Sequence, residues 1–441
     1  MSTKTLFGTD GVRGVANVDL TPEMALGLTR AAGEGCSGVA VVGRDTRRSG
    51  QMLAAAVHAG FQAAGLDTVD LGIIPVGAVS HFTLDLRAAF GVMVSASHNP
   101  AADNGIKFFG PDGAKLDDEA EASIESRYRH LPPVTPLSGA DLGIQVSMGN
   151  SVERYVEAIA RVSEFGLNGL EVVLDCANGA AFLAAPSLFE RLGAGVVAVA
   201  IEPSGMNIND GCGATRPEYL AGVAEGSIGL SFDGDADRLI AVDEDGEIVN
   251  GDAIMAILAR HLRGRDQLPG DKIVATVMSN LGFKMAMQNL GVSVLETQVG
   301  DRYVLEEMRS SGAGLGGEQS GHVIFGRRPT GDGLLTGMRL LEVVAATGAP
   351  LKELRRIMKD LPQVLRNVTV RVKDRLPDAA DVWAAVEKAE KRLGGEGRVL
   401  VRASGTEPLV RVMVEARSAP EAAGIADGIA IVVRRELGGV R

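Results

Sequence analysis

Short apolar runs alternate with helix-like segments along most of this chain, and each run ends in a loop of glycine and polar residues. The run at 88–94 is typical of a buried strand, and similar runs occupy 39–42, 172–175, 228–232 and 272–278. Strands that alternate with helices predict mainly parallel sheets with helices on their faces. In such sheets ligands gather at the carboxyl ends of the strands. The loops after these runs are therefore the candidate sites of chemistry.

The pattern also divides the chain into domains. The 441 residues are long enough for several cores, and the prolines at 132, 133 and 136 indicate a linker. The alternation then restarts twice, whereas the last segment carries three strand-like runs and two helical ones, an α+β pattern. We expect three similar α/β domains with mixed sheets at 1–135, 151–250 and 251–362, and a smaller C-terminal α+β domain at 363–441.

Composition excludes several classes of protein. The net charge is −12 and aromatic residues make up 4% of the chain, so neither a basic face for nucleic acid nor a base-stacking surface is expected. Cys36, Cys176 and Cys212 are widely spaced, which indicates neither a disulfide framework nor a zinc site. The N-terminus has no apolar signal segment and no run of 18 apolar residues occurs. We expect a cytoplasmic protein without a membrane or nucleic-acid partner.

The run at 88–94 leads into Ser95-Ala96-Ser97-His98-Asn99-Pro100. Pro100 cannot continue a strand ladder and biases the residue before it towards a turn, so the hydroxyl of Ser97 is presented at a strand end. A turn in which Ser and Asn bond their own backbone would account for the same residues. The pair Asn104-Gly105 then predicts a hairpin turn that returns Lys107 towards Ser97, although a solvated lysine is the ordinary alternative.

Three aspartates, Asp233, Asp235 and Asp237, alternate in the loop after the run at 228–232. Carboxylates this close raise one another's pKa unless a cation lies among them, and ligands that are all oxygen suit Mg²⁺, Mn²⁺ or Ca²⁺. An EF-hand calcium loop is disfavoured because Arg238 occupies the position where that loop needs glycine. A solvated acidic turn is the other alternative.

Two further loops carry polar groups in a compact arrangement. Arg402-Ala403-Ser404-Gly405-Thr406-Glu407-Pro408, followed by Arg411, offers guanidinium and hydroxyl donors around a glycine, which suits a phosphate. A hairpin with ordinary surface arginines is the alternative. The loop at 317–322 combines Glu318, Ser320 and His322, groups that could bind the hydroxyls or the amine of a sugar.

Taken together and in this order, these loops and Gly8-Thr9-Asp10-Gly11-Val12-Arg13-Gly14 resemble the α-D-phosphohexomutase superfamily, over essentially the whole chain. The resemblance implies four domains around a central cleft and a small-molecule sugar phosphate as substrate. It also implies a monomer or homodimer, one Mg²⁺ per subunit, and glucose or glucosamine 1,6-bisphosphate as activator.

The resemblance assigns roles residue by residue. Ser97 matches the phosphorylated serine, which with Asp233, Asp235 and Asp237 would hold Mg²⁺. Glu318 and Ser320 match the sugar-binding loop, and Arg13, Lys107 and His322 match positions proposed for catalysis or proton transfer. The phosphate-binding loop is matched by Arg402, Ser404, Gly405, Thr406 and Arg411. Ala236 stands in the metal loop where some relatives carry glycine.

The sugar-binding loop bears on the substrate. Gln319 stands where phosphomannomutase and phosphoglucomutase relatives usually carry methionine, which favours a member that interconverts the 6- and 1-phosphates of an amino sugar, a step towards UDP-N-acetylglucosamine and cell-wall precursors. The alternative within the superfamily is a phosphoglucomutase/phosphomannomutase. A phosphatase that hydrolyses its phosphoserine and a silent sugar-phosphate sensor are alternatives of other classes.

Overall fold

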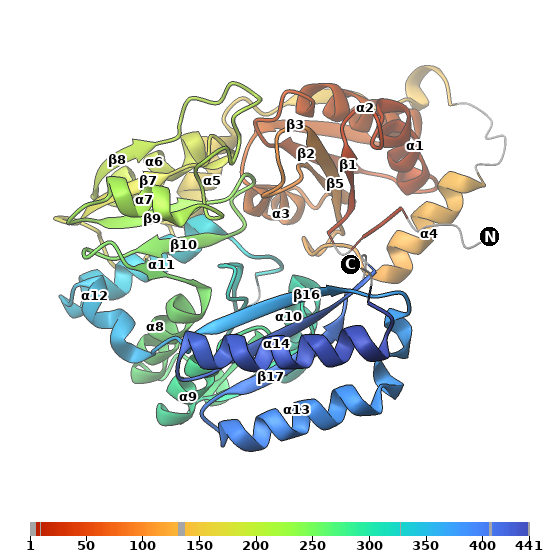
Figure 1. Cartoon of the computed structure of the whole chain (residues 1–441). Helices are drawn as coiled ribbons and strands as arrows, with labels where there is room; N and C mark the ends of the chain where they lie inside the picture. Colours follow the sequence, from red (N-terminus) through yellow and green to blue (C-terminus); the bar gives the residue numbers. More distant parts are fainter. Residues whose placement is uncertain (1–5, 9, 131–136, 327, 405–407, 440–441) are drawn as a thin grey trace. The chain divides into compact units, whose positions relative to one another are not determined.

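The computed structural model describes residues 6–8, 10–130, 137–326, 328–404 and 408–439 (Figure 1). Its contacts form two compact parts. The first part comprises Met1–Met278 and Val292–Ile357, and the second comprises Ser279–Gly291 and Met358–Arg441. The described residues form four sheets, three in the first part and one in the second.

The first sheet is mixed and carries the loop of Ser97. Its strands lie in the order β1 (Val12–Val15), β5 (Asp103–Phe109), β4 (Phe90–Val94), β2 (Val39–Arg44), β3 (Asp67–Ile73) and β6 (Gln145–Ser147). β4, β2, β3 and β6 run parallel, and β5 is antiparallel to β1 and β4. The carboxyl ends of β2 and β4 therefore lie side by side, which places the loops after them together.

Helices cover both faces of this sheet. They are α1 (Pro22–Gly33), α2 (Gly50–Ala63), α3 (Val76–Asp85) and α4 (Asp118–Arg129). Leu28 of α1 and Phe61 of α2 share a buried cluster with Val42 of β2, and each such side chain contributes roughly 1.5–3 kcal/mol on burial. A Cβ on the next residue, Gly43, would lie 2.6 Å from Val79 of α3. Because successive strand residues face opposite sides, α3 covers the other face.

The second sheet carries the aspartate loop. Its strands lie in the order β11 (Ile248–Val249), β10 (Leu239–Val242), β9 (Ile228–Phe232), β7 (Glu171–Asp175) and β8 (Gly195–Val199), with helices α5 (Ser151–Ala160), α6 (Ala181–Arg191) and α7 (Pro217–Val223). A Cβ on Gly229 would meet Leu220 of α7, whereas Leu230 lies near Gly337 of α11 (Gly333–Thr347), which also approaches Phe189 of α6. α7 therefore covers one face, and α6 and α11 cover the other.

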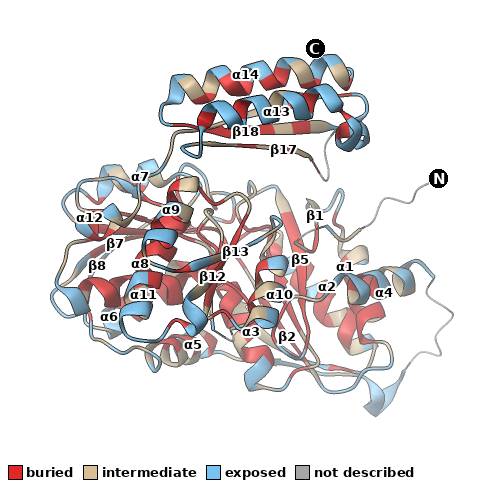
Figure 2. Cartoon of the chain, turned by 90° about the horizontal axis from the view of Figure 1, so that it is seen from below, coloured by how far each residue is buried: buried red, intermediate tan, exposed pale blue. Residues whose placement is uncertain are grey.

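The third sheet carries the loop of Glu318. Its order is β13 (Ser293–Thr297), β12 (Lys272–Thr276), β14 (Leu315–Gly317) and β15 (Val323–Phe325), and α8 (Gly251–Gly264), α10 (Asp301–Ser311) and α12 (Leu351–Leu354) accompany it. A Cβ on Gly316 would lie 2.7 Å from Met308 of α10, and one on Gly317 would lie 3.1 Å from Met255 of α8. The glycines thus let helices approach both faces closely. Strands β12, β14 and β15 are largely buried, whereas the edge strand β13 is not (Figure 2).

The second part has one antiparallel sheet, β16 (Gln363–Thr369), β18 (Leu409–Glu415) and β17 (Arg398–Ala403), packed on α13 (Ala380–Leu393) and α14 (Ala419–Glu436). It also includes α9 (Leu281–Asn289). The Leu281 N–H donates to Glu415 Oε2 at 2.9 Å, and the side chain of Asn280 exchanges two hydrogen bonds with the backbone of Leu361. These bonds attach α9 to this part.

The predicted fold class is confirmed: mixed-sheet α/β units and a C-terminal α+β unit are present. The predicted hairpin is confirmed, since β4 and β5 pair antiparallel, but its turn does not lie at Asn104-Gly105, because both residues are inside β5. The chain turns earlier, because Gly105 must pack its backbone against the Ser95 carbonyl, which a Cβ would approach to 2.4 Å. Among the described residues no single helix is long and apolar enough to cross a membrane, while one bent pair, Gly333–Thr347 with Leu351–Ile357, meets those criteria jointly.

Candidate active site

Ser97 lies in the loop between β4 and β5 and is 1% exposed. Its backbone is left-handed, with φ of 51°. The hydroxyl donates to Asp233 Oδ2 at 2.6 Å and lies 3.2 Å from His98 Nδ1. Burial, followed by the charges of Arg238 and Arg13, lowers the pKa of His98 to about 4, so its ring is neutral at pH 7. The structure therefore joins the serine loop to the aspartate loop.

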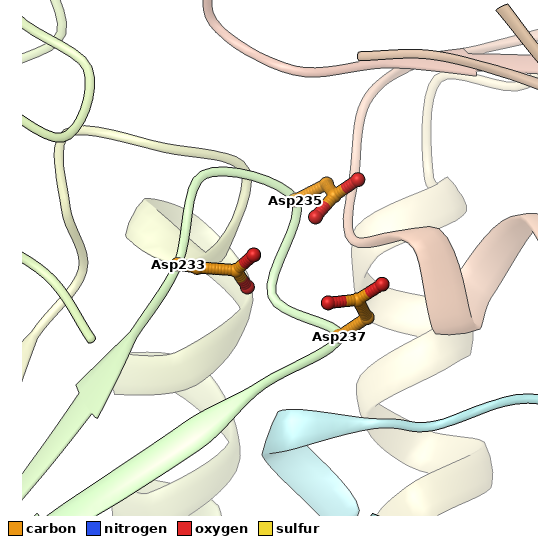
Figure 3. Close-up of side chains that lie close together, drawn as sticks. All are labelled: Asp233, Asp235 and Asp237. Carbon is orange, nitrogen blue, oxygen red and sulfur yellow. The ribbon is translucent and has the colours of Figure 1, made fainter. Parts of the chain in front are cut away.

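Asp233, Asp235 and Asp237 follow β9 directly, and their carboxylates converge (Figure 3). All three are buried, and one oxygen from each lies within 4.8 Å of the others. Ala236 between them has a left-handed φ of 60°, which explains why glycine also suits this position. Strands β9 and β10 flank the loop, which excludes an EF-hand because that motif needs helices there.

The electrostatics of the three carboxylates favour a bound cation. Burial, with the charges of Asp237 and Asp235, raises the pKa of Asp233 to about 8. Among the described residues, Asp235 Oδ1 and Asp237 Oδ1 are buried and accept no hydrogen bond. A buried carboxylate oxygen without a donor is costly, and a hard cation would satisfy all three groups. The residues present fit a metal site of oxygen ligands.

Lys107 is buried on β5 at 1% exposure, so a solvated lysine is excluded. Its Nζ lies 2.8 Å from Asp235 Oδ2, 3.7 Å from Asp237 Oδ2 and 3.0 Å from Asp10 Oδ2. Burial alone would lower the pKa of Lys107, but these three carboxylates together raise it. Arg13 on β1 pairs with Asp10 and lies 3.5 Å from Asn99 Oδ1, which brings it to the same loop as Ser97.

Six titratable side chains form a closed ring in the first part of the chain, in which carboxylates alternate with nitrogen-bearing side chains. The ring runs Lys107, Asp10, Lys115, Asp301, His322, Asp237 and back to Lys107. His322 Nδ1 lies 3.6 Å from Asp237 Oδ2, and Nε2 lies 3.7 Å from Asp301 Oδ2. Burial alone would lower the pKa of His322. The charges of Asp237 and Asp301 outweigh burial, so the pKa is raised. The N–H of Gly331 donates to Nε2 at 3.1 Å, which needs the neutral ring with its proton on Nδ1.

Asp10, Lys115 and Asp301 were not predicted as site residues. Burial raises the pKa of Asp10, but Lys107, Lys115 and Arg13 hold it well below its usual range. Lys115 and Asp301 are 186 residues apart, so no local spacing relates them. The one available signal was Asp10 beside Arg13 in a glycine-bracketed loop.

The predicted sugar-binding loop lies against the aspartate loop. Glu318 accepts a hydrogen bond from the Gly300 N–H at 3.2 Å and another from the Ser320 hydroxyl at 3.1 Å. The Leu239 N–H donates to the Gly321 carbonyl at 3.0 Å. A Cβ on Gly321, whose φ is 92°, would collide with Leu239. The glycine therefore lets the two loops touch, and it brings Glu318, Ser320 and His322 beside the aspartates.

A buried polar cluster below Ser97 was also not predicted. Arg47 and Asp45 follow β2, are 3% and 1% exposed, and form an ion pair at 2.9 Å. Ser95 donates to Asp45 at 2.6 Å. The sequence did show arginines after a buried strand, but nothing in it related them to the serine loop 50 residues later.

The predicted phosphate loop lies in the second part of the chain. Arg402 of β17 is directly opposite Arg411 of β18. Like charges opposite one another destabilise a strand pair, and burial, followed by the charge of Arg411, lowers the pKa of Arg402. Ser404 is buried, and its N–H donates to the Leu409 carbonyl at 2.9 Å. An anion would relieve the repulsion here. Gly405 and Thr406 lie outside the described residues.

Comparison with known proteins identifies the family. Four domain models described as phosphoglucomutase/phosphomannomutase match the chain: alpha/beta/alpha domain I at residues 4–133, domain II at 153–246, domain III at 250–361 and the C-terminal domain at 365–432.

Individual relatives agree with the domain models. The phosphoglucosamine mutase of Symbiobacterium thermophilum is 52% identical over 98% of this chain and 99% of its own length, and that of Moorella thermoacetica is 52% identical over 96% and 98%. Among solved structures, a phosphoglucomutase/phosphomannomutase family protein from Burkholderia thailandensis is 28% identical, with a TM-score of 0.83 over 100% of this chain and 99% of its own. The chain therefore belongs to the phosphoglucomutase/phosphomannomutase family of isomerases, the α-D-phosphohexomutases, and within it to the phosphoglucosamine mutases.

Proposed function

We propose that the chain interconverts glucosamine 6-phosphate and glucosamine 1-phosphate through a phosphorylated Ser97 and a bisphosphate intermediate. The observation that carries this proposal is the Ser97 hydroxyl, which faces Asp233 at 2.6 Å among three buried carboxylates. The names of the relatives at about 50% identity support the amino sugar, as does Gln319. The product would feed the synthesis of UDP-N-acetylglucosamine and cell-wall precursors in the cytoplasm.

Asp233, Asp235 and Asp237 would hold Mg²⁺ together with an oxygen of the phosphorylated Ser97. Phosphorylation adds about −1.5 to −2 charge, and the ion would neutralise that charge and polarise the phosphorus. Lys107, whose pKa three carboxylates raise, is suited to remain charged beside the phosphoryl group. His322, at the end of the sugar-binding loop, would take part in proton transfer to or from the sugar hydroxyl. Arg13 would add a second positive charge near the phosphoryl group on Ser97.

Glu318 and Ser320 would bind the sugar, since a carboxylate and a hydroxyl together suit adjacent sugar hydroxyls or an amine. Arg402, Ser404, Gly405, Thr406 and Arg411 would hold the phosphate that is not reacting. The bisphosphate must present each of its two phosphates to Ser97 in turn. The phosphate-binding residues therefore have to bind the intermediate in both orientations. Glucose or glucosamine 1,6-bisphosphate would act as activator by phosphorylating Ser97 of enzyme that has lost its phosphate. We propose domain bounds of 1–135, 151–250, 251–362 and 363–441.

The test is a side-by-side assay of glucosamine, glucose and mannose 6-phosphates with Mg²⁺ and a trace of bisphosphate, with products followed by phosphorus NMR. We expect the highest kcat/KM for glucosamine 6-phosphate. An equal or higher value for glucose or mannose 6-phosphate would favour the phosphoglucomutase/phosphomannomutase alternative. Release of free phosphate as the main product would indicate a phosphatase, and binding without turnover would indicate a sensor.

A further inference from the structure

Both backbone polar groups of Ser97 are held by side chains, of which Ser95 and Arg47 are buried and Asn209 is partly buried. Its N–H donates to Ser95 Oγ at 2.9 Å. Its carbonyl accepts from Arg47 Nη2 at 3.0 Å and from Asn209 Nδ2 at 2.9 Å. The residue has a left-handed φ of 51°, which is unfavourable for any residue with a Cβ. Such a conformation persists where the surroundings over-determine it, and here three side chains do so.

Arg47 uses all five N–H groups of its guanidinium, four of them on the loop of Ser97 and one on Asp45. Its acceptors are Asp45 Oδ2 at 2.9 Å, Asp103 O at 3.0 Å, Ser97 O at 3.0 Å, Asn99 O at 2.7 Å and the carbonyl of Pro100. Four of these are backbone carbonyls between Ser97 and Asp103. A lysine would offer three donors from a single nitrogen and could not match this fork. The arrangement therefore depends on arginine at this position.

Asp45 and Ser95 close the network. Asp45 Oδ1 accepts from the N–H of Arg47 at 2.9 Å, and Oδ2 accepts from both Arg47 Nε and Ser95 Oγ. Ser95 Oγ in turn accepts from the Ser97 N–H. A continuous path of hydrogen bonds thus leads from the Ser97 amide through two side chains to Arg47 and back to the Ser97 carbonyl. All members of this path are buried.

The network matters because the direct bond from Ser97 Oγ to Asp233 cannot survive phosphorylation. Once Oγ carries a phosphoryl group it has no hydrogen to donate, and the new negative charge faces three carboxylates. The backbone bonds made by Arg47, Ser95 and Asn209 do not involve Oγ. They are therefore the contacts that can be identical in the phosphorylated and the free enzyme.

We propose that Arg47 is the positioning residue of Ser97: through Asp45 and Ser95 it fixes the Ser97 amide and carbonyl, so that Oγ keeps one place while its substituent changes during the cycle. This inference rests on the proposed role of Ser97 as phosphoryl carrier. Arg47 does not touch the reacting atoms, so its loss should affect the rate of phosphoryl transfer and leave the affinity for sugar phosphate nearly unchanged.

The experiment compares Arg47→Lys and Ser95→Ala with two controls. Arg48→Ala removes an exposed arginine one residue further on, and Ser80→Ala removes a buried hydroxyl that bonds the Gly113 carbonyl. Intact-mass spectrometry first establishes phosphate on Ser97 of the wild type. Three quantities are then measured at a temperature where each variant is folded: the single-turnover rate of phosphoryl transfer from glucose 1,6-bisphosphate to Ser97, kcat, and KM.

We expect Arg47→Lys and Ser95→Ala to lower the transfer rate and kcat together by at least about tenfold, with KM within about threefold, and the controls to behave as the wild type. Folded variants with a transfer rate within twofold of the wild type would overturn the inference and leave the proposed function intact. A reduced melting temperature with an unchanged rate would show a purely structural role and would also overturn it. If Arg47→Lys does not fold, Ser95→Ala alone decides. A wild type that never carries phosphate on Ser97 would instead refute the proposed function.

Discussion

The hydroxyl of Ser97 donates to Asp233 at 2.6 Å, although 136 residues separate the two in the chain. Each residue stands just beyond the carboxyl end of a strand, β4 for the serine and β9 for the aspartate. The contact joins two different sheets, and Gly234 makes it possible, since a Cβ there would lie 2.4 Å from the Ser97 carbonyl. The proposed nucleophile and the candidate metal site thus meet through loops and not through regular structure.

The first prediction concerns Ser97 itself. Ser97→Ala should carry no phosphate after incubation with glucose 1,6-bisphosphate, and its turnover should fall by at least about 1000-fold because the nucleophile is gone. Intact mass, peptide mapping and a coupled assay measure both effects. Ser80→Ala, a buried hydroxyl elsewhere in the same sheet domain, serves as control. Phosphate that persists on the alanine variant would show that another residue is the acceptor.

The second prediction concerns the metal. A chelator should abolish activity, and Mg²⁺ should restore it. Asp235→Asn should weaken activation by Mg²⁺ at least about 100-fold, since losing an outer-sphere partner alone typically costs 10- to 100-fold. The measurement is activity against free Mg²⁺, with Asp245→Asn as control because Asp245 is exposed and pairs with Lys352. Full activity of a metal-free preparation would rule the metal out.

The third prediction concerns Lys115, which lies between two carboxylates of the ring. Lys115→Met should lower the free energy of unfolding by about 1 to 3 kcal/mol, because Asp10 and Asp301 lose their shared cation in a partly buried site. Lys115 lowers the pKa of both, so its stabilisation is present above their unfolded pKa of about 3.9 and is lost as pH falls through the lower folded values. Urea unfolding at pH 7 and at pH 3 should show the deficit shrink.

The double variant Lys115→Met with Asp301→Asn is the check on that explanation. Removing one carboxylate along with the lysine should recover part of the lost stability, which simple loss of packing would not allow. Arg161→Met, on an exposed helical pair with Glu157, is the matched control and should leave unfolding nearly unchanged.

Local patterns predicted the parts of this structure that depend on neighbouring residues. The apolar runs predicted at 88–94, 172–175 and 228–232 correspond to β4, β7 and β9. The aspartate triplet could be identified because its members lie two residues apart in one loop. The burial of Lys107 was not foreseen, because its three carboxylate partners come from two distant loops.

What the sequence did not predict depends on contacts between distant segments. The sequence did not relate Arg47 or Lys115 to any partner, because the carbonyls and carboxylates around them come from distant segments. The turn assigned to Asn104-Gly105 failed for a similar reason. Local propensity favours a turn there. In the structure Gly105 lies inside a strand, where its backbone approaches the Ser95 carbonyl too closely to leave room for a Cβ. Tertiary packing outweighed local preference at the residues nearest the site.

The fourth prediction concerns the cysteines. Iodoacetamide at pH 8 should label one thiol of the native protein, Cys36, because Cys36 is exposed while Cys176 and Cys212 are buried. Burial, followed by Asp175 and Asp210, raises the pKa of Cys212 to about 12, and burial raises that of Cys176 further, so neither forms a thiolate at this pH. Mass spectrometry should find one label in the native protein, none in Cys36→Ser, and three after unfolding. A label on native Cys212 would contradict the burial seen here.

The last prediction concerns the facing arginines of the second part. Arg402 and Arg411 lie directly opposite one another on β17 and β18, so the repulsion between them favours a bound anion. Arg411→Ala should raise KM for both glucosamine 6-phosphate and glucosamine 1-phosphate by about 10- to 100-fold, the value of one charge-assisted hydrogen bond. Arg411→Lys should recover the charge but not the forked geometry, and so only part of the affinity.

Arg366→Ala is the control, because Arg366 is on the neighbouring strand β16 and pairs with Asp427 of α14 at the surface. Forward and reverse kinetics with both sugar phosphates measure the effect, and an unchanged KM in both directions would show that Arg411 does not hold the phosphate.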